Sequence, residues 1–268
     1  MLSALAPARR RLVLAVGGLV LAAAVGICAF VVAHLATSEG PGRPVDQAVP
    51  GPVLLVPGYG GSTASLGPLA ASLRSAGRDV TVVELPDRAL GDLRDQADAL
   101  SAVATRVLAR TGASSVDVVG YSAGGIVARM WVQEGGGAAS VRRLVTLGSP
   151  HHGTQLAGLG ALVAGACPVA CQQLDPTSPV LARLNGVALP AGPRYLSVWT
   201  TQDDVVLPPA SAELDGARSV AVQDVCPDDR VRHSGLPEDG VVRAMVAGSL
   251  GAGPVPAWGP ADCARLSS

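Results

Sequence analysis

Residues 116–130 read VDVVGYSAGGIVARM, and this stretch decides the predicted fold. Val116–Val119 favour a buried strand, whereas the apolar residues of 126–133 follow the spacing of a helix. Between the two segments, Ser122 stands at the centre of a G-x-S-x-G motif, two positions from Gly120 and from Gly124. The absent side chains of these glycines let a strand and a helix approach closely around a strained turn. We therefore predict that Ser122 is a nucleophile held at a sharp corner.

Short apolar segments alternate with segments of helical spacing along the chain after residue 52. Strands are predicted at 53–56, 80–85, 116–119, 144–147, 195–199 and 220–222, and helices at 66–76, 93–110, 126–133 and 241–250. This alternation predicts an α/β fold with a mostly parallel central sheet of about six strands and helices on both faces. The interval 150–193 is rich in glycine and proline and has no clean period, so we expect it to form a small cap at most, or a wall beside the site.

The composition is that of one enzyme-sized domain. The chain has 268 residues and a formal net charge of −1, and its 20 basic residues are all arginine. Apart from Arg9–Arg11 these arginines form no cluster, so we expect no nucleic-acid partner. The sequence does not indicate an oligomeric state.

The N-terminal segment predicts export. Leu12–Ala33 is an uncharged apolar run of 22 residues that follows Arg9–Arg11. Such a run is long enough to cross a bilayer, and the preceding positive charges favour the cytoplasmic side for the N-terminus. Residues 1–36 are thus predicted to be a signal anchor, or a cleaved signal peptide, that brings the chain to the membrane. Residues 37–52 are predicted to be a flexible linker, and residues 53–268 a catalytic domain.

A serine nucleophile needs a base and an orienting carboxylate. Of the four histidines, only His233 follows the last predicted strand, which agrees with the chain order serine, acid, histidine expected for this motif. Asp203 and Asp204 both follow the strand predicted at 195–199, and one of them is expected to orient the imidazole. The amide of Ala123 is expected at a helix N-terminus, where it can donate to a developing oxyanion.

These segments together resemble the α/β-hydrolase superfamily, and within it the small exported bacterial lipases and esterases of the triacylglycerol lipase type. The resemblance covers 53–250 and rests on LLVPGYGGS, VDVVGYSAGGIVAR, LVTLGSPHHGT, TTQDDVVLP, DGARSVAVQDVC and RHSGL. It implies a carboxylic-ester hydrolase that acts through an acyl-enzyme on a lipid or small acyl-ester substrate, without a cofactor. It also implies a second oxyanion amide at Tyr59, and its acid motif selects Asp203 over Asp204. Many relatives have His-Gly where this chain has Pro57-Gly58.

The N-terminal segment, together with the resemblance to exported bacterial enzymes, implies a place outside the cytoplasm, on the extracellular side of a bacterial membrane or in the medium. Three alternatives to ester hydrolysis stay open: acyl transfer to an acceptor other than water, another serine hydrolase such as a peptidase, and a non-catalytic surface binding protein. No metal is expected at His151 and His152, since adjacent residues of an extended segment point in opposite directions. The acidic residues near 224–229 lack the spacing of a calcium loop.

Four cysteines lie on the exported side of the apolar run, a number that suits a compartment where disulfides form. Three pairings are possible. We favour Cys167 with Cys171, which would stiffen the segment beside the site, and Cys226 with Cys263, which would tie the C-terminal tail to the loop before His233. Four free thiols are the alternative.

Overall fold

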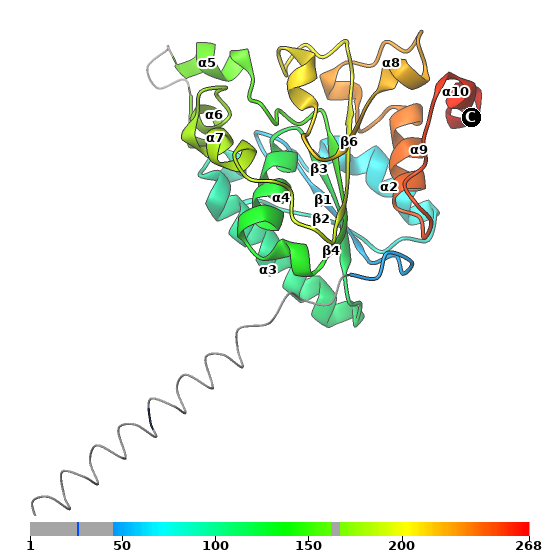
Figure 1. Ribbon diagram of the computed structural model, residues 1–268, viewed down its shortest axis with the longest axis horizontal. Coiled ribbons are helices and arrows are strands. Elements are labelled where there is room, and N and C mark those ends of the chain that lie inside the picture. Colours follow the sequence, from blue (N-terminus) through cyan, green and yellow to red (C-terminus); the bar gives the residue numbers. More distant parts are fainter. Residues whose placement is uncertain (1–25, 27–44, 162–166, 268) are drawn as a thin grey trace, which may run out of the picture. The chain divides into compact units, whose positions relative to one another are not determined.

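The computed structural model describes Gly26 and residues 45–161 and 167–267 (Figure 1). The chain divides into two compact units, Met1–Arg43 and Pro44–Ser268, and all elements named below belong to the second. Apart from Gly26, the predicted signal segment at 1–36 lies outside the described residues. Within the described ranges, no helix combines the length and the apolar composition needed to span a membrane.

The core of the second unit is a sheet of six parallel strands in the order β2-β1-β3-β4-β5-β6. The predicted α/β class, the parallel sheet and the number of strands are confirmed. The strands are β1 (Val53–Val56), β2 (Val80–Val82), β3 (Val116–Tyr121), β4 (Val141–Leu147), β5 (Arg194–Trp199) and β6 (Arg218–Ala221). Strand β2 is shorter than predicted, because the apolar run continues past Val82 into the loop before Pro86. Strand β4 begins earlier than predicted, because Arg142 and Arg143 are buried strand residues.

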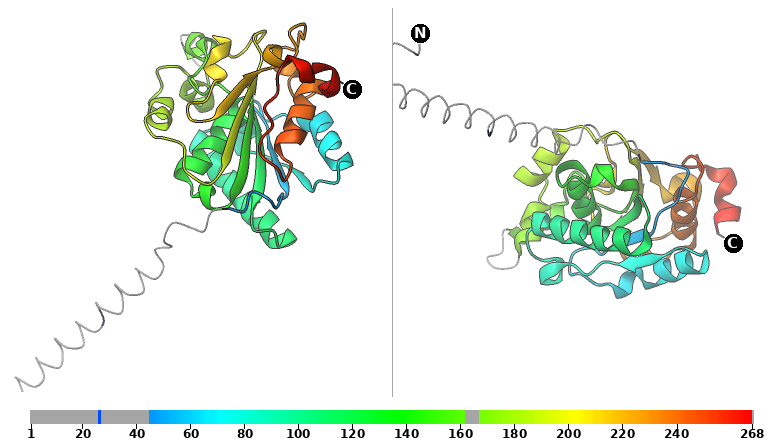
Figure 2. Two further views of the ribbon diagram at one scale, coloured as in Figure 1. Left: turned by 45° about the vertical axis from the view of Figure 1, so that its right-hand side comes forward. Right: turned by 90° about the horizontal axis from the view of Figure 1, so that it is seen from below.

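Helices cover both faces of the sheet, as predicted (Figures 1 and 2). α2 (Gly67–Ser75) and α9 (Gly240–Ser249) pack on one face, and α3 (Leu93–Thr111) and α4 (Ala123–Glu134) on the other. Strand β1 shows why both faces are needed: Val53 and Leu55 belong to the core on the α2 and α9 side, and Leu54 and Val56 to the core on the α3 and α4 side. Alternate residues of a strand point to opposite faces, so a wholly apolar strand requires two cores.

The interval 150–193 contains short helices that the sequence did not reveal. They are α5 (Gln155–Ala161), α6 (Val169–Gln173) and α7 (Pro179–Asn185). Each has at most two turns, too few to produce a clear hydrophobic period. The remaining short helical elements are η2 (Ala64–Leu66), η3 (Pro86–Ala89), η4 (Gly137–Ala139), η5 (Pro209–Ala212), α8 (Val222–Val225), η6 (His233–Gly235), η7 (Pro260–Asp262) and α10 (Cys263–Leu266).

The strand order creates a crevice at the carboxyl ends of β1 and β3. The chain leaves β1 toward β2 on one side, then returns to β3 on the other side and continues toward β6. The loops after β1 and β3 therefore diverge from neighbouring strands, and open parallel sheets bind ligands at such a point. Ser122 directly follows β3, so the topology places it at this crevice.

A buried carboxylate shared by two arginines lies at the opposite end of the sheet, near the amino ends of β3 and β4. The carboxylate of Asp117 is fully buried and accepts hydrogen bonds from Arg142 (Nε to Oδ1, 2.8 Å; Nη2 to Oδ2, 2.6 Å) and from Arg78 (Nη2 to Oδ2, 2.6 Å). Arg142 also donates to the carbonyl of Gln47, at 2.9 Å. Part of the interval 37–52, predicted to be a linker, thus contacts the folded unit. The side-chain Nε2 of Gln47 also donates to the carbonyl of Gly192, at 3.2 Å.

Candidate active site

Ser122 lies at the tight turn that joins β3 to α4. Its backbone has φ 52° and ψ −128°, a left-handed conformation that costs a non-glycine residue free energy. The turn is tight because α4 runs back against β1: a Cβ on Gly124 would lie 2.4 Å from the carbonyl oxygens of Val56 and of Pro57. The G-x-S-x-G spacing thus has a direct steric reason in this chain.

The structure brings Ser122, His233 and Asp203 together. The hydroxyl Oγ of Ser122 lies 3.0 Å from Nε2 of His233, and Nδ1 of the same imidazole lies 2.8 Å from Oδ2 of Asp203. Because an ionised carboxylate only accepts, Nδ1 carries the proton and Nε2 is free to accept the hydroxyl proton of Ser122. His233 and Asp203 are both buried, whereas the serine is half-buried at the crevice.

The backbone holds Asp203 in this orientation. Its second oxygen, Oδ1, accepts hydrogen bonds from the amides of Val205 (2.9 Å) and Val206 (2.7 Å). Its neighbour Asp204 points to solvent and pairs with Arg232 at 3.1 Å. Asp203 is therefore the carboxylate that meets the imidazole, and Asp204 does not reach it.

Tyr121 supports the histidine from the end of β3. Its hydroxyl donates to the carbonyl of His233 at 3.2 Å, and the two ring centroids are 5.3 Å apart. The side chain is 9% exposed. Burial, with a further effect of the Asp203 carboxylate, raises the pKa of Tyr121 to about 12, so it stays a donor throughout the physiological range. No local sequence pattern indicates this contact, because the partner is a backbone carbonyl 112 residues away.

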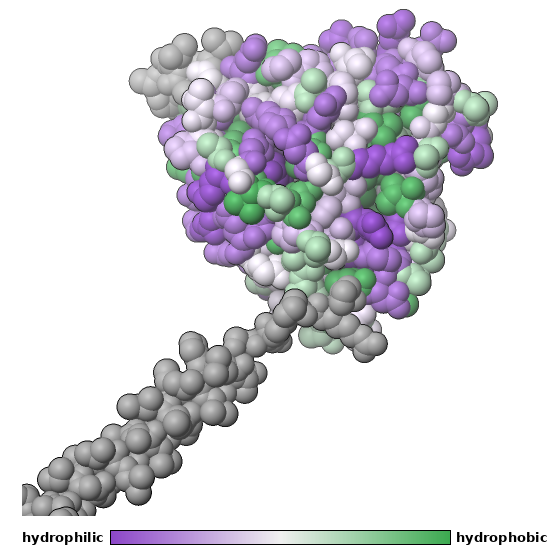
Figure 3. Space-filling view, in the orientation of Figure 1, coloured by the Kyte–Doolittle hydropathy of each residue, from purple (hydrophilic) through white to green (hydrophobic). Residues whose placement is uncertain are grey.

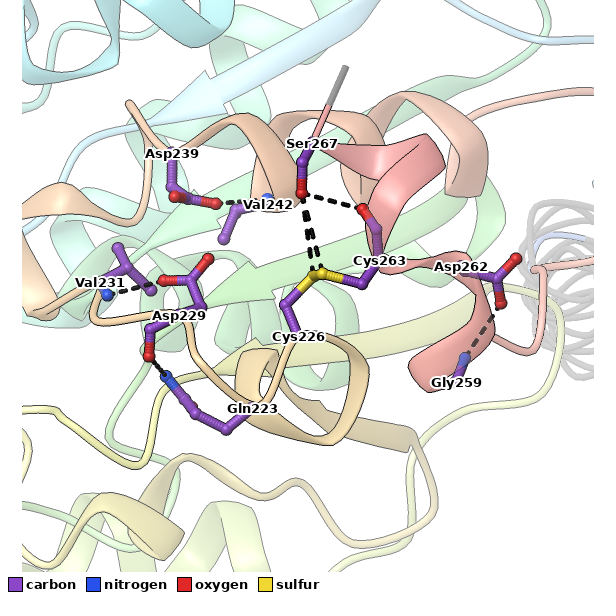
Figure 4. The surroundings of a disulfide bond; sticks show 10 residues. All are labelled: Gln223, Cys226, Asp229, Val231, Asp239, Val242, Gly259, Asp262, Cys263 and Ser267. Atoms are coloured by element: carbon purple, nitrogen blue, oxygen red, sulfur yellow. Dashed lines mark hydrogen bonds between the residues drawn. A yellow bond between two sulfur atoms is a disulfide. The ribbon is translucent and has the colours of Figure 1, made fainter.

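Hydrogen bonds and a disulfide stabilise the loop before His233 (Figure 4). The carboxylate of Asp229 accepts from the amide of Val231 at 2.7 Å, and the carbonyl of Asp229 accepts from Gln223 at 3.2 Å. A disulfide joins Cys226, at the end of α8, to Cys263, at the start of α10. The C-terminal tail is thereby linked covalently to the segment that carries the histidine.

The loop after β1 lies directly beside Ser122. A Cβ on Gly58 would lie 2.9 Å from the Cβ of Ser122, so only glycine permits this approach. Tyr59 follows and lines the same cavity as the serine. Ala123 is the first residue of α4, and the first amides of a helix have no intrahelical acceptor. Both amides predicted to face an oxyanion thus belong to segments that adjoin Ser122.

A cavity of about 290 Å³ opens beside the serine, with a mainly apolar lining. Its lining residues are Tyr59, Ser122, Pro150, Thr154, Leu156, Ala157, Cys171, Leu174, Val205 and Val206. The interval 150–193 therefore forms a wall of the cavity, and the disulfide between Cys167 and Cys171 lies in that wall. On the face of the molecule in Figure 3, hydrophobic and hydrophilic side chains alternate in small patches.

His151 and His152 do not form a site with each other. His151 is fully buried, and its Nε2 donates to Thr146 Oγ1 at 3.0 Å, because that hydroxyl itself donates to Ser197. Burial and then the charge of Arg129 lower the pKa of His151 well below its usual range. His152 is exposed and lies near Asn185. Among the described residues, no three His, Cys, Asp or Glu side chains are grouped as a metal would require.

Comparison with known proteins finds one family model and several solved structures that this chain resembles. The family model described as palmitoyl protein thioesterase matches residues 52–179. A lipase B from Aspergillus fumigatus has a similar structure, with a TM-score of 0.69 and 20% identity over 81% of this chain and 56% of its own. A Bacillus licheniformis lipase is also similar: its propeptide form has a TM-score of 0.57 and 23% identity over 67% of this chain and 47% of its own. Its mature form has a TM-score of 0.57 and 22% identity over 68% of this chain and 86% of its own.

The chain spans about half the length of the first two of these structures. At this level of identity the likeness shows a shared fold.

Proposed function

We propose, from the premise that this chain has the α/β-hydrolase fold its sequence resembles, that it is a serine hydrolase of carboxylic esters. One observation carries the proposal: Ser122, His233 and Asp203 form an unbroken line of hydrogen bonds, of 3.0 and 2.8 Å, at the sheet's crevice. The family model and the lipases of the same fold support a substrate with an acyl group.

In this mechanism Nε2 of His233 accepts the hydroxyl proton of Ser122 while Oγ attacks the carbonyl carbon of the ester. The carbonyl oxygen becomes an oxyanion, and the amides of Ala123 and Tyr59 donate to it. Collapse of this intermediate breaks the bond to the alcohol, which takes the proton from His233 and leaves. The acyl group is then attached to Ser122.

A water molecule completes the cycle. His233 removes its proton as the oxygen attacks the acyl carbon, and the carboxylic acid leaves when Ser122 regains its proton. Asp203 keeps the imidazole in the tautomer that both steps need and stabilises its positive charge. The apolar cavity beside the serine would accept the acyl chain. Its volume of about 290 Å³ is at the low end for ligand sites, roughly 300–1,000 Å³, which favours short or medium chains.

A second candidate is the hydrolysis of acyl thioesters, which the match to the palmitoyl protein thioesterase model favours. The same three residues would act in the same order, with a thiolate leaving instead of an alcohol. Acyl transfer to another acceptor uses the same acyl-enzyme and differs only in what replaces water.

We further propose that residues 53–268 are the catalytic domain of an exported protein attached to, or released from, the outer side of a membrane. The two disulfides support this location, since such bonds form and persist in oxidising compartments. The attachment itself would be through the segment at 12–33, which lies outside the described residues.

The test is a chain-length series of p-nitrophenyl esters, assayed beside acyl thioesters and peptide substrates. We expect turnover of esters, with a preferred chain length, and no cleavage of peptides. Ser122→Ala, which removes only the attacking hydroxyl, is the control for background hydrolysis. The proposal would be overturned by folded protein that turns over no ester and no thioester. If peptides are not cleaved either, the remaining candidate is a non-catalytic surface binding protein.

A further inference from the structure

Three arginines lie on one face of the sheet, at the amino ends of β4, β5 and β6. Arg143 and Arg194 are register partners in β4 and β5, and Arg218 pairs with Leu196, two residues beyond Arg194. Residues i and i+2 of a strand point to the same face, so all three side chains project on the same side. The candidate active site lies at the carboxyl ends of the strands. Because all six strands are parallel, the three arginines lie at the opposite end of the sheet.

The three side chains line one cavity of about 780 Å³. This volume is more than twice that of the cavity beside Ser122. The other lining residues come from the start of the folded unit, from the loop before β5 and β5 itself, from Gly216 and from the C-terminal tail: Asp46, Gln47, Ala48, Pro193, Tyr195, Gly216, Ala252, Gly253, Pro254 and Val255. The cavity is thus built from segments far apart in the sequence.

The positive charge of this cavity is not balanced. Among the residues that the structure describes, no carboxylate lies within ion-pair distance of Arg143, Arg194 or Arg218. The nearby carboxylate of Asp117 is already shared by two other arginines. Asp46 is the single acidic residue of the lining, and its Oδ1 accepts from the amide of Ala48 at 2.9 Å. Three cations therefore face one anion.

Two of the arginines are held in place. Arg143 is 2% exposed and donates to the carbonyls of Ser249 and Gly253, while its buried Nε has no acceptor among the described residues. Burial and then the charge of Arg142 lower the pKa of Arg143, which shows how unfavourable its surroundings are for a cation. The guanidinium of Arg218 lies over the ring of Trp258, with 6.0 Å from Cζ to the centroid. An anion would relieve the repulsion, and of the three arginines only the exposed Arg194 would have to lose side-chain freedom to bind it.

We propose that this cavity is a binding site for a phosphate group, provided by a phospholipid headgroup or by a soluble phosphate ester. Guanidinium groups suit phosphate because their planar N–H donors match its oxygens in pairs. Arg194 and Arg218 would contact the ligand directly. The buried Arg143 would contribute positive charge without contacting it. The cavity wall at Asp46 lies thirteen residues after Ala33, where the apolar run ends, and thirteen residues span at most about 45 Å. A membrane-anchored chain would therefore keep the site within reach of headgroups.

The first test uses the full-length protein in neutral detergent. Its Tm is measured against inorganic phosphate, with sodium chloride holding the ionic strength constant. We expect the Tm to rise with the logarithm of the phosphate concentration above the Kd, by about 4 °C at ten times the Kd. Arg194→Gln with Arg218→Gln should abolish the rise, and Lys at both positions should keep part of it. Arg106→Gln with Arg230→Gln removes the same charge from exposed positions outside this cavity and should leave the rise intact.

The second test separates the two sources of phosphate. The full-length protein is placed in phosphatidylcholine vesicles with or without phosphatidic acid. If a headgroup fills the site, phosphatidic acid raises the Tm and inorganic phosphate then adds nothing. If a soluble ester fills it, vesicle composition has no effect and inorganic phosphate still acts. Both results support the site.

The proposal is overturned if neither phosphate nor phosphatidic acid raises the Tm, or if the double Gln variant responds as the wild type does. Ester hydrolysis should be unchanged in the double Gln variant, because both arginines lie at the amino ends of their strands and Ser122 lies at the carboxyl end of β3. A negative result here would thus leave the proposed function as it stands.

Discussion

Nδ1 of His233 lies 2.8 Å from Oδ2 of Asp203, although thirty residues separate the two in the chain. The carboxylate follows β5 and the imidazole follows β6, and these strands are neighbours in the sheet. The order of the strands therefore brings the two side chains together. Conservative substitutions of single side chains can test the function of this contact.

Asp203→Asn should lower kcat by a factor on the order of 10³ to 10⁴, because an amide at Nδ1 favours the wrong tautomer of the imidazole. Asp204→Asn is the matched control: it makes the same change one residue away, at a solvent-exposed carboxylate, and should leave kcat within about twofold. Steady-state kinetics on a p-nitrophenyl ester measures both. Equal losses in the two variants would contradict the assignment.

Ser122→Ala should lower kcat by roughly 10⁴-fold or more, since no other hydroxyl can attack in its place. The Tm should change little, because alanine has the same difficulty as serine at φ 52°. A fluorophosphonate should label Ser122 in the wild type and nothing in the variant, as read by peptide mapping. Ser75→Ala, at an exposed serine that ends α2, should keep both labelling and rate. Label on any other serine would refute the nucleophile.

Tyr121→Phe should lower kcat by about fivefold with KM nearly unchanged. The lost hydrogen bond to the carbonyl of His233 is worth about 1 kcal/mol, and it positions the imidazole without touching substrate. Tyr195→Phe removes a similar bond, to the carbonyl of Pro190, far from the crevice and serves as the control. An unchanged kcat in Tyr121→Phe, or a rise in KM alone, would show that the contact does not position the histidine.

Replacing Cys226 and Cys263 by serine should destabilise the protein by about 4 kcal/mol, and replacing Cys167 and Cys171 by about 2 kcal/mol. The difference follows from loop size, because the first bond closes residues 226–263 and the second only 167–171. Denaturant unfolding of the two double variants measures it. A larger loss from the short loop would show that strain or packing, and not chain entropy, dominates.

The stability of the fold should decrease on acidification because of His151. Its pKa in the fold is well below 6.5, so below pH 6.5 the unfolded chain binds a proton that the folded chain does not. Stability is therefore complete above pH 6.5 and is lost as the pH falls, by at most about 1.4 kcal/mol per pH unit. His151→Gln should flatten the slope between pH 6.5 and 5.

The exposed His152 provides the control for that slope. His152→Gln makes the same change at the neighbouring, exposed ring and is the matched control variant. Free energies of unfolding at four or five pH values suffice for the comparison. Equal slopes in both variants would assign the acid sensitivity to the carboxylates.

The sequence allowed the sheet and the position of Ser122 to be predicted because both depend on local patterns. Apolar runs mark the strands, and the spacing of Gly120 and Gly124 around Ser122 marks the turn. The choice of His233 needed only chain order. The choice between Asp203 and Asp204 needed a family pattern, since adjacent aspartates in a loop are chemically alike.

Other features depend on contacts that no local pattern contains. Tyr121 donates to a distant backbone carbonyl, and the burial of Arg142 depends on Asp117 and on carbonyls of residues 250 and 251. An arginine in a strand predicts exposure until its partners are known. The same holds for the phosphate cavity, whose three arginines become neighbours only through strand register.

The bond between Cys226 and Cys263 encloses His233 within a covalent ring. A protease that cuts the backbone once between these cysteines, for example in the exposed tail near Gly253, would separate no fragment from the protein. Both new ends would stay attached through the sulfurs, and the imidazole would stay on the same molecule as Ser122. For the proposed exported hydrolase, this would give resistance to nicking: a single cleavage there changes the mobility of the chain on a reducing gel without removing the imidazole proposed as the general base.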